Sequence, residues 1–533
     1  MEHSSSYHAE RGERIVRMTG AQARRGLVPA VLVVVLAAVT AACSAADGGG
    51  APPTSVRRGP NPAVRLSPAA PTTTTEPPLP VTPVQWAPCG SLQCGSVTAP
   101  LDYSRPTGPS LQIAVARHPA EVPAERIGSL VINPGGPGGS GIDDLPNELS
   151  VLPVELLDRF DVVSFDPRGV ERSSPVTCST SAGSQASSGP PVDPVPATPL
   201  EQLQLLASDR QFANACEQAS GSLLPYVGTV DAAKDLDRIR QAVGDSGLTF
   251  IGHSYGTLLG ATYAELFPTH VRAMVLDGAI DPALTTVQYL TGQADSLEAD
   301  LQSFFAWCAG NSGCAWRPAS DPTTALLALI QHVTDAPLPA TGGNTAGPGT
   351  IYSTLLAGLE AQSSWPSLAN ALAAATAGNG SAASSMSSRY DSGGSTNGAQ
   401  AEQAIDCLDH PTDRNPSSYP GLAAQAGQAA PVFGPLLAWG LLSCATWPAL
   451  PTRTPGPASD PGAPPIVVVG TTGDPVTPYK WAVALAGELS GGDLLTWQGR
   501  SHVAYFYSSC VRAAYQSYLV SGVTPPPGAV CSD

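Results

Sequence analysis

Lysine is nearly missing from this sequence of 533 residues: only Lys234 and Lys480 occur, and the formal net charge is −17. Binding to nucleic acid requires clustered basic side chains against the phosphates, so the composition excludes a nucleic-acid partner. No group of Cys and His has metal-ligand spacing, so we expect no metal and no other cofactor. The acidic balance favours solubility and identifies no substrate.

Long apolar runs are lacking after the N-terminus. The single such stretch, Leu27–Val39, follows several arginines and is too short for a comfortable membrane span. Small residues and then Cys43 come next, which resembles a bacterial lipoprotein signal, although Thr40 stands where that signal usually has Leu. We expect residues 1–43 to be a signal peptide with Cys43 as the lipidated residue. A plain secretory signal cleaved near Ala42 is the alternative.

Cysteine usage gives a second indication of export. Eleven cysteines are present, and lipidation of Cys43 would leave ten, an even number suited to an oxidising compartment. Sequence alone leaves the connectivity open. The simplest pairing joins near neighbours: Cys89–Cys94, Cys178–Cys216, Cys308–Cys314, Cys407–Cys444 and Cys510–Cys531. We therefore expect a protein of the cell envelope, lipid-anchored to the outer face of the cytoplasmic membrane and monomeric.

The remaining chain divides by composition. Residues 44–80 are rich in Pro, Thr and Ser and predict a disordered tether. Residues 81–281 and 461–533 alternate short apolar strands with helices, which indicates a mostly parallel sheet of the α/β class. Residues 282–460 break this rhythm and predict a helical cap, inserted between the sixth and seventh core strands. A Gly/Ser/Ala-rich part of it, 376–398, predicts a flexible loop.

The strongest motif is Gly252-His253-Ser254-Tyr255-Gly256, which follows the apolar strand Leu248–Ile251 and precedes a small-residue helix. This strand, turn and helix context is that of the nucleophile elbow of the α/β-hydrolase fold, in which glycines allow a sharp turn that exposes the serine. An inert serine in a packing turn is the alternative. We predict that Ser254 is the nucleophile.

A serine needs a base, and in this fold the acid and then the base follow the nucleophile along the chain. Of the histidines after Ser254, only His502 follows the last core strand; the others are His270, His332 and His410. Asp474 follows the preceding strand, Ile466–Val469, at the edge where such sheets place their functional groups. We predict His502 as base and Asp474 as the acid that orients it, with Asp277 as the rival acid.

Glycines after the early strand Leu130–Asn133 predict the oxyanion hole. The loop reads Pro134-Gly135-Gly136-Pro137-Gly138-Gly139 and lacks the Lys-Ser/Thr pair of a phosphate loop. Glycine lets a backbone N–H approach the substrate closely. We expect the donors to be the N–H of Tyr255 and an N–H from Gly135 or Gly136.

Together these motifs, with Phe165-Asp166-Pro167-Arg168-Gly169 and Gly473-Asp474-Pro475-Val476-Thr477-Pro478, resemble those of the secreted tripeptidyl-aminopeptidases of actinobacteria, relatives of the proline iminopeptidases. The resemblance runs from about residue 80 to the C-terminus. It implies an α/β-hydrolase core, a helical cap and release of short peptides from free N-termini. Where the family commonly has Arg-Gly-x-Gly-x-Ser, Glu171 replaces the second glycine and adds a carboxylate near the site. We interpret Asp166 and Arg168 as a structural pair that braces this loop.

An enzyme that reads a free N-terminus must hold an ammonium group, usually with carboxylates. The cap offers Glu402, Asp406 and Asp409, although an ordinary solvated helix face explains any one of them equally well. We therefore expect a serine exopeptidase acting on peptides. The alternatives are a carboxylesterase or lipase with the same triad, since the cap decides the substrate, and a non-catalytic envelope lipoprotein that uses the fold for binding.

Overall fold

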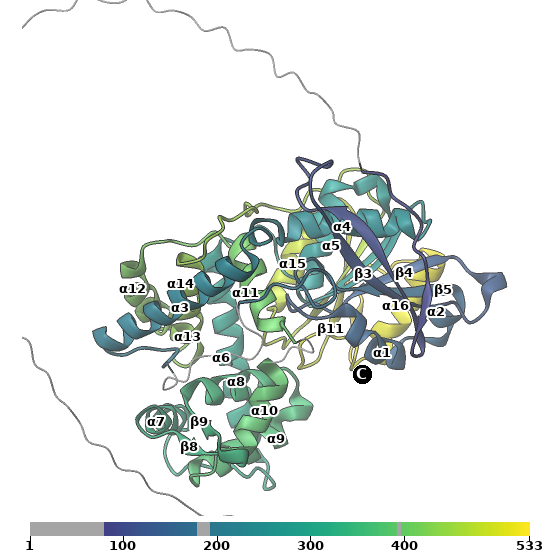
Figure 1. The fold of residues 1–533 in the computed structure, drawn as a ribbon. Helices are drawn as coiled ribbons and strands as arrows, with labels where there is room; N and C mark the ends of the chain where they lie inside the picture. The colour runs from purple at the N-terminus through teal and green to yellow at the C-terminus, as the bar shows by residue number, and fades with distance from the viewer. Residues whose placement is uncertain (1–78, 179–191, 392–395) are drawn as a thin grey trace, which may run out of the picture. The chain divides into compact units, whose positions relative to one another are not determined.

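The computed structural model describes residues 79–178, 192–391 and 396–533. The expected signal peptide, Cys43 and nearly all of the expected tether lie outside these residues. The described chain is built on one ten-stranded sheet with the order β1-β2-β3-β5-β4-β6-β7-β10-β11-β12, flanked by helices (Figure 1). The interior of this sheet is parallel, as the sequence predicts, and its first edge is antiparallel.

The strands predicted from apolar runs are all present, with ends that differ by a few residues. The sheet strands are β1 (Ala87–Cys89), β2 (Leu92–Pro100), β3 (Ser110–His118), β4 (Gly128–Asn133), β5 (Phe160–Phe165), β6 (Leu248–His253), β7 (Val271–Asp277), β10 (Ile466–Thr471), β11 (Gly492–Trp497) and β12 (Val530–Cys531). The strands β1, β2 and β12 were not expected, because β1 and β12 are very short and β2 mixes polar and apolar residues. Seven strands of the sheet precede the helical insertion, whereas the sequence predicted six.

Two layers of helices cover the sheet, one on each face. Helices α4 (Thr229–Ala242), α5 (Tyr255–Leu266) and α15 (Tyr479–Glu488) bury their apolar sides against one face. Helices α1 (Gly141–Val151), α2 (Val154–Arg159) and α16 (Ser509–Ser521) bury theirs against the other. The central strands β4, β5, β6 and β10 are buried along their whole length, which explains why they read as continuous apolar runs.

Between β7 and β10 the described chain is mostly helical, and we call this segment the cap. Its helices are α6 (Thr286–Gly310), α7 (Pro322–Asp335), α8 (Pro348–Leu359), α9 (Trp365–Thr376), α10 (Ser381–Asp391), α11 (Gly398–Asp409), α12 (Tyr419–Ala426), α13 (Phe433–Gly440) and α14 (Leu442–Ala445). The strands β8 (Leu338–Pro339) and β9 (Thr345–Ala346) form a two-stranded sheet of their own. Helices α7 to α10 share one apolar cluster with α6 and lie together in Figure 1.

Two details of the cap differ from the sequence prediction. The segment expected to be a flexible loop contains α10, because small residues such as Ala383 pack against the neighbouring helices. Helix α3 (Pro199–Ser220), assigned by sequence to the core, contacts α14 and shares an apolar cluster with α11 (Figure 1). Its position is set by tertiary packing, and local sequence periodicity does not predict which elements a helix packs against.

Disulfide bonds tie several of these elements. The five bonds are Cys89–Cys94, Cys178–Cys216, Cys308–Cys314, Cys407–Cys444 and Cys510–Cys531, the pairs that near spacing suggested. Cys178–Cys216 joins the chain after β5 to α3, and Cys407–Cys444 joins α11 to α14. Within the described ranges, no helix is both long and apolar enough to span a bilayer, and no cluster of possible metal ligands occurs.

Candidate active site

Ser254 occupies the turn between β6 and α5, with φ 54° and ψ −122°. A positive φ is costly for a residue with a side chain, and such strain is typical of functional turns. The Ser254 N–H donates to the carbonyl oxygen of Asp277 at the end of β7, at 2.9 Å. The turn therefore lies at the carboxyl edge of the sheet, as the sequence predicts.

The two glycines of the motif are required by space. A Cβ on Gly252 would lie 2.3 Å from the carbonyl oxygen of Gly256, and a Cβ on Gly256 would lie 2.7 Å from that of Asn133. Both distances are shorter than any real contact. The chain passes so close to itself at the elbow that only glycine fits, which explains the spacing of the motif around Ser254.

His502 and Asp474 come together from two neighbouring loops. The acid loop, residues 472–478, connects β10 to α15, and the base loop, residues 498–508, connects β11 to α16. The Nδ1 atom of His502 lies 3.1 Å from both carboxylate oxygens of Asp474. Burial disfavours the charged imidazole, but the Asp474 carboxylate outweighs burial and raises the pKa of His502 above its usual value.

Asp474 is itself held by three further donors. The backbone N–H groups of Val476 and Thr477 donate to its Oδ1 at 2.9 and 2.8 Å, and the Thr477 hydroxyl donates to its Oδ2 at 3.0 Å. The Thr477 hydroxyl also lies 3.3 Å from Nδ1 of His502. These contacts fix the carboxylate in the position that an orienting acid needs.

The rival acid, Asp277, has other partners. Its carboxylate accepts the N–H groups of Ala504 and Tyr505 at 3.1 and 2.9 Å and the hydroxyl of Tyr515 at 2.8 Å. It is completely buried and thereby ties β7 to the base loop and to α16. This arrangement favours Asp474 as the acid and gives Asp277 a structural task.

The oxyanion loop, residues 134–140 between β4 and α1, packs against the elbow. A Cβ on Gly135 would lie 2.5 Å from the carbonyl oxygen of His253, and both Gly135 and Gly136 have positive φ. The Gly135 N–H is already engaged, since it donates to Asn133 Oδ1 at 3.2 Å. Of the two glycines expected as donors, the geometry therefore favours Gly136. Tyr255 begins α5, where first-turn N–H groups have no partner within the helix.

A cavity of about 480 Å³ opens onto Ser254, Tyr255 and Gly136. The core supplies its floor and the cap supplies its walls, which are largely apolar. The cap residues on the walls include Tyr289, Leu290, Gln293 and Leu297 from α6, Tyr352 and Leu356 from α8, Leu436 and Leu437 from α13, and Glu402, Gln403 and Asp406 from α11. Substrate bound over Ser254 would thus be enclosed mainly by the cap.

The three carboxylates of α11 fall into two groups. Glu402 and Asp406, one helical turn apart, both line the cavity. Burial, then the nearby Glu402 and Asp409, raise the pKa of Asp406 well above its usual value. Asp409 is engaged elsewhere: its Oδ1 accepts the N–H of Thr229 at 3.1 Å and its Oδ2 accepts the Thr229 hydroxyl at 2.5 Å.

Asp409 therefore differs from the role suggested by its sequence. It is 1% exposed and supplies the side-chain acceptor at the start of α4. Thr229 is the first residue of α4, and its hydroxyl also lies 2.6 Å from that of Tyr255. A distant residue took over the capping task, which no local pattern reveals.

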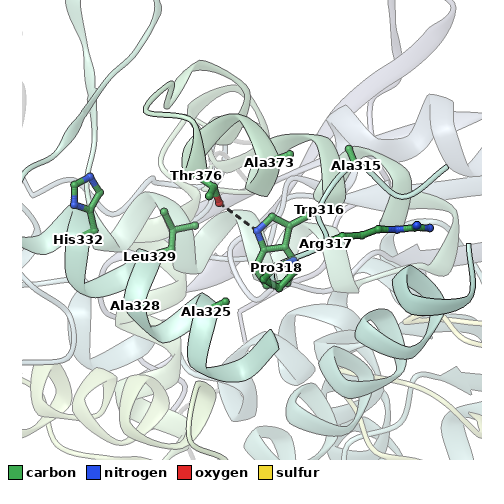
Figure 2. A pocket seen from close by; sticks show the side chains of 10 residues that line it. All are labelled: Ala315, Trp316, Arg317, Pro318, Ala325, Ala328, Leu329, His332, Ala373 and Thr376. Atoms are coloured by element: carbon green, nitrogen blue, oxygen red, sulfur yellow. Dashed lines mark hydrogen bonds between the residues drawn. The ribbon is translucent and has the colours of Figure 1, made fainter. Parts of the chain in front are cut away.

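The other histidines lie in settings that do not suit a base. His270 pairs with Asp237 at 2.9 Å on the core. His332 lines a separate cavity of about 490 Å³ in the cap, with Trp316 and Thr376, as Figure 2 shows. His410 does line the Ser254 cavity, but burial and the charge of Arg453 lower its pKa to about 4.

The loop after β5 is braced differently from the expectation. Arg168 forms its ion pair with Asp235 at 2.6 Å, whereas Asp166 accepts from Ser140 at 2.5 Å and pairs with Arg172 at 3.0 Å. Asp166 and Arg168 are thus both structural, but they do not pair with each other.

Glu171 adopts φ 38°, the left-handed region that suits the glycine of the related sequences. Its backbone N–H donates to Asn397 Oδ1 at 3.0 Å, and its carboxylate accepts the N–H of Thr396. Asn397 also donates to the carbonyl oxygen of Gly169 at 2.8 Å. The added carboxylate therefore ties this loop to the segment before α11 and is not among the groups that line the Ser254 cavity.

Comparison with known proteins gives the same fold and two family models. Residues 128–320 match a model described as alpha/beta hydrolase fold, and residues 430–531 match one described as TAP-like protein. The chain is 37% identical over 485 residues to "Serine protease Hip1" of Mycobacterium tuberculosis, covering 84% of this chain and 91% of that protein. The chain belongs to the TAP-like serine peptidase family of the α/β-hydrolase superfamily.

Two further relatives of this TAP-like chain carry different names. "Tripeptidyl aminopeptidase" of Streptomyces lividans is 30% identical over 84% of this chain and 86% of its own length. "Carboxylesterase B" of Mycobacterium tuberculosis is 34% identical over 83% of this chain and 86% of its own length. Among solved structures, the proline iminopeptidase of Mycobacterium smegmatis matches with a TM-score of 0.38, 14% identity and coverage of 80% and 97%. The two family models and the relative at 37% identity confirm the predicted family and the predicted fold.

Proposed function

We propose that this protein is an exported serine exopeptidase that releases short peptides from free N-termini. The observation that carries the proposal is the pairing, in one cavity, of a strained serine at the elbow and two carboxylates on α11. A relative named as a tripeptidyl aminopeptidase supports the substrate class. The five disulfide bonds support export, because such bonds persist in oxidising compartments.

The reaction follows from the proposed triad, Ser254, His502 and Asp474. His502 takes the proton of Ser254 Oγ as this oxygen attacks the scissile carbonyl carbon, and Asp474 stabilises the resulting imidazolium. The N–H groups of Tyr255 and Gly136 donate to the oxyanion. Collapse breaks the C–N bond, and His502 gives its proton to the leaving amine. Water, activated by the same histidine, then hydrolyses the acyl-enzyme and restores Ser254.

The proposed partners of the substrate amine are Glu402 and Asp406. Burial raises the pKa of Asp406 well above its usual value and so favours the neutral form, whereas an ammonium group beside it would favour the charged form. An ammonium in a partly dry cavity needs such a partner, because its desolvation is otherwise unfavourable. The distance from the α11 carboxylates to Ser254 would then set the length of the released peptide.

Attachment to the envelope is the second part of the proposal. Residues 1–43 would direct export, Cys43 would carry the lipid, and the segment to residue 80 would act as a tether for the monomeric enzyme. Mass spectrometry of the mature N-terminal peptide tests this part. An acylated Cys43 supports it, whereas an unmodified N-terminus beyond Cys43 rules out the anchor.

A carboxylesterase is the second candidate, favoured by the apolar walls of the cavity and by the relative of that name. One experiment separates the candidates: kcat/KM for a tripeptide amide with a free amine, for its N-acetylated form and for a short acyl ester, with Ser254→Ala as the blank. Strong preference for the free amine supports the exopeptidase. Fast ester hydrolysis with no peptide cleavage supports the esterase, and internal cleavage of acetylated peptides indicates an endopeptidase.

A further inference from the structure

One face of α6 carries three polar side chains that reach beyond the cap. Gln293, Ser296 and Asp300 are spaced at i, i+3 and i+7, which places them along one side of the helix. Apolar residues of the same helix, Leu290 and Leu297, line the substrate cavity. Helix α6 is therefore both a wall of the cavity and a source of polar contacts to the core.

Two of these contacts reach the acid loop. The Ser296 hydroxyl donates to the backbone carbonyl oxygen of Asp474 at 2.6 Å. The Gln293 amide donates to the carbonyl oxygen of Val476 at 3.1 Å. Helix α6 thus bonds the backbone on both sides of Pro475, within the loop that presents the Asp474 carboxylate to His502.

The third contact reaches the base loop. Asp300 forms an ion pair with Arg500 at 3.1 Å, and its side chain is 5% exposed, compared with 43% for Arg500. The chain after α8 adds backbone bonds to the same loop: Gln362 N–H donates to the carbonyl oxygen of Arg500 at 3.0 Å, and His502 N–H donates to that of Glu360 at 2.7 Å. The cap therefore holds the residues on either side of Ser501 by both side chain and backbone.

We propose that the cap positions the acid and the base of this enzyme, and that Asp300 and Arg500 form the latch through which α6 holds the base loop. Neither residue is expected to touch the substrate's reacting atoms; each acts through His502. The inference rests on the triad assignment of the proposed function but not on the choice between peptide and ester substrates.

The latch requires an ionised Asp300. Burial raises the pKa of Asp300 to about 6, although Arg500 opposes the shift, and Asp474 is the other charged group that acts on Asp300 and favours the neutral form. The folded-state pKa lies above the usual value for Asp, so the ion pair is present above pH 6 and is lost as the pH falls through 6. A contact that did not depend on the charge of Asp300 would lack this dependence.

The test compares Asp300→Asn and Arg500→Gln with wild type, using kcat and KM for a small neutral acyl ester between pH 5 and 8. Misplacement of a catalytic group by a fraction of an ångström costs up to about a hundredfold, so we expect kcat at pH 8 to fall by about tenfold with KM nearly unchanged. Arg500→Lys, which keeps the charge, should recover part of kcat.

The pH dependence is read as the ratio of wild-type kcat to that of Asp300→Asn, which cancels the titration of His502. From about tenfold at pH 8, this ratio should shrink to about twofold at pH 5, where most Asp300 is protonated in the wild type. Arg105→Gln is the matched control, because Arg105 forms an exposed ion pair with Asp102 outside the site. It should leave kcat unchanged at every pH.

A second variant tests the backbone hydrogen bond between the cap and the base loop. Gln362 is the first residue of a 3₁₀ turn, where proline is tolerated, and the preceding Ala361 is extended, as a residue before proline must be. Gln362→Pro therefore removes the N–H that donates to Arg500, along with the glutamine side chain. We expect kcat to fall several-fold while the melting temperature changes little.

Values of kcat within twofold of wild type for Asp300→Asn and Arg500→Gln at pH 8 would overturn the proposal. A loss that stays constant from pH 5 to 8 would overturn the ionised latch as its cause. Ser254→Ala, measured in parallel, keeps the two levels apart. If Ser254→Ala retains turnover, the triad assignment fails; if it is inactive while the latch variants are normal, only the latch fails.

Discussion

Ser254 and the oxyanion amides are supported by the sheet and α5, whereas Asp474 and His502 are supported in part by the cap. On the nucleophile side, glycines and backbone bonds leave the chain no other path, as at Gly252 and Gly135. On the acid–base side, side chains of α6 and backbone after α8 complete the support. The nucleophile side is thus rigid by construction, and the acid–base side depends on a second part of the molecule.

Ser254→Ala tests the nucleophile side and should have the largest effect on activity. We expect turnover to fall by about 10⁴-fold or more, because the remaining site offers only the oxyanion donors and binding. The melting temperature should change little, since the substitution removes one small hydroxyl group. Labelling with a fluorophosphonate probe should disappear in parallel, and residual labelling would point to another nucleophile.

Asp474→Asn breaks the acid–base side. We expect kcat to fall by roughly 10⁴-fold, because the amide favours the wrong tautomer of His502. Asp277→Asn is the matched comparison. The Asp277 carboxylate accepts two N–H groups and a hydroxyl, so this substitution should lower the melting temperature strongly and kcat only slightly. The reverse result would make Asp277 the acid.

Asp406→Asn probes the cap without touching either catalytic side. We expect kcat/KM for free-amine peptides to fall by about ten- to a hundredfold, the effect of losing a charge-assisted hydrogen bond, while acyl esters are spared. In the wild type, free-amine binding should strengthen as pH rises and Asp406 ionises, then weaken as the substrate amine, with a pKa of about 8, loses its proton. Equal losses for both substrate classes would indicate a folding defect instead.

Thr477→Val sharpens the comparison within the acid loop. The hydroxyl donates to Asp474 Oδ2 at 3.0 Å, and its loss leaves two backbone donors in place. We expect about a tenfold loss of kcat, consistent with one hydrogen bond to a charged group. Thr477→Ser keeps the hydroxyl, so its kcat should stay close to that of the wild type. A kcat for Thr477→Ser as low as that of Thr477→Val would show that the hydroxyl is not responsible for the loss.

Glu171 offers the smallest expected effect, on the loop beside the nucleophile side. The left-handed backbone at Glu171 costs about 1 kcal/mol, and Glu171→Gly removes this cost but also removes the hydrogen bond to Thr396. The two effects oppose each other, so the free energy of unfolding should change by less than about 1 kcal/mol. Glu171→Ala keeps the strain and loses the bond, and should be the less stable variant by urea denaturation. Neither should alter kcat.

Sequence predicted the nucleophile side better than the acid–base side in one physical respect. The elbow and its glycines are local, so spacing alone reveals why Gly252 and Gly256 flank Ser254. The contacts of Asp300 and Ser296 with the two loops join residues about 180 to 200 positions apart along the chain, and no local pattern encodes them. The same limit explains the unexpected capping role of Asp409 and the packing of α3.

The choice between the two candidate oxyanion glycines also depends on a contact that the sequence does not show. Gly135 and Gly136 are equivalent by sequence, but Asn133 Oδ1 accepts the N–H of Gly135 and leaves Gly136 as the better oxyanion donor. The existence of the central strands and of the core helices, by contrast, follows from buried apolar runs and helical periodicity, which are strong signals.

The double use of α6 restricts how this enzyme can diversify. Leu290 and Leu297 shape the substrate cavity, while Ser296 and Asp300 on the same helix hold the catalytic loops. A shift of α6 that suited a new substrate would disturb the acid and the base at the same time. New specificities should therefore arise more readily through α8, α11 and α13, and laboratory evolution aimed at those helices should yield more active variants than libraries in α6.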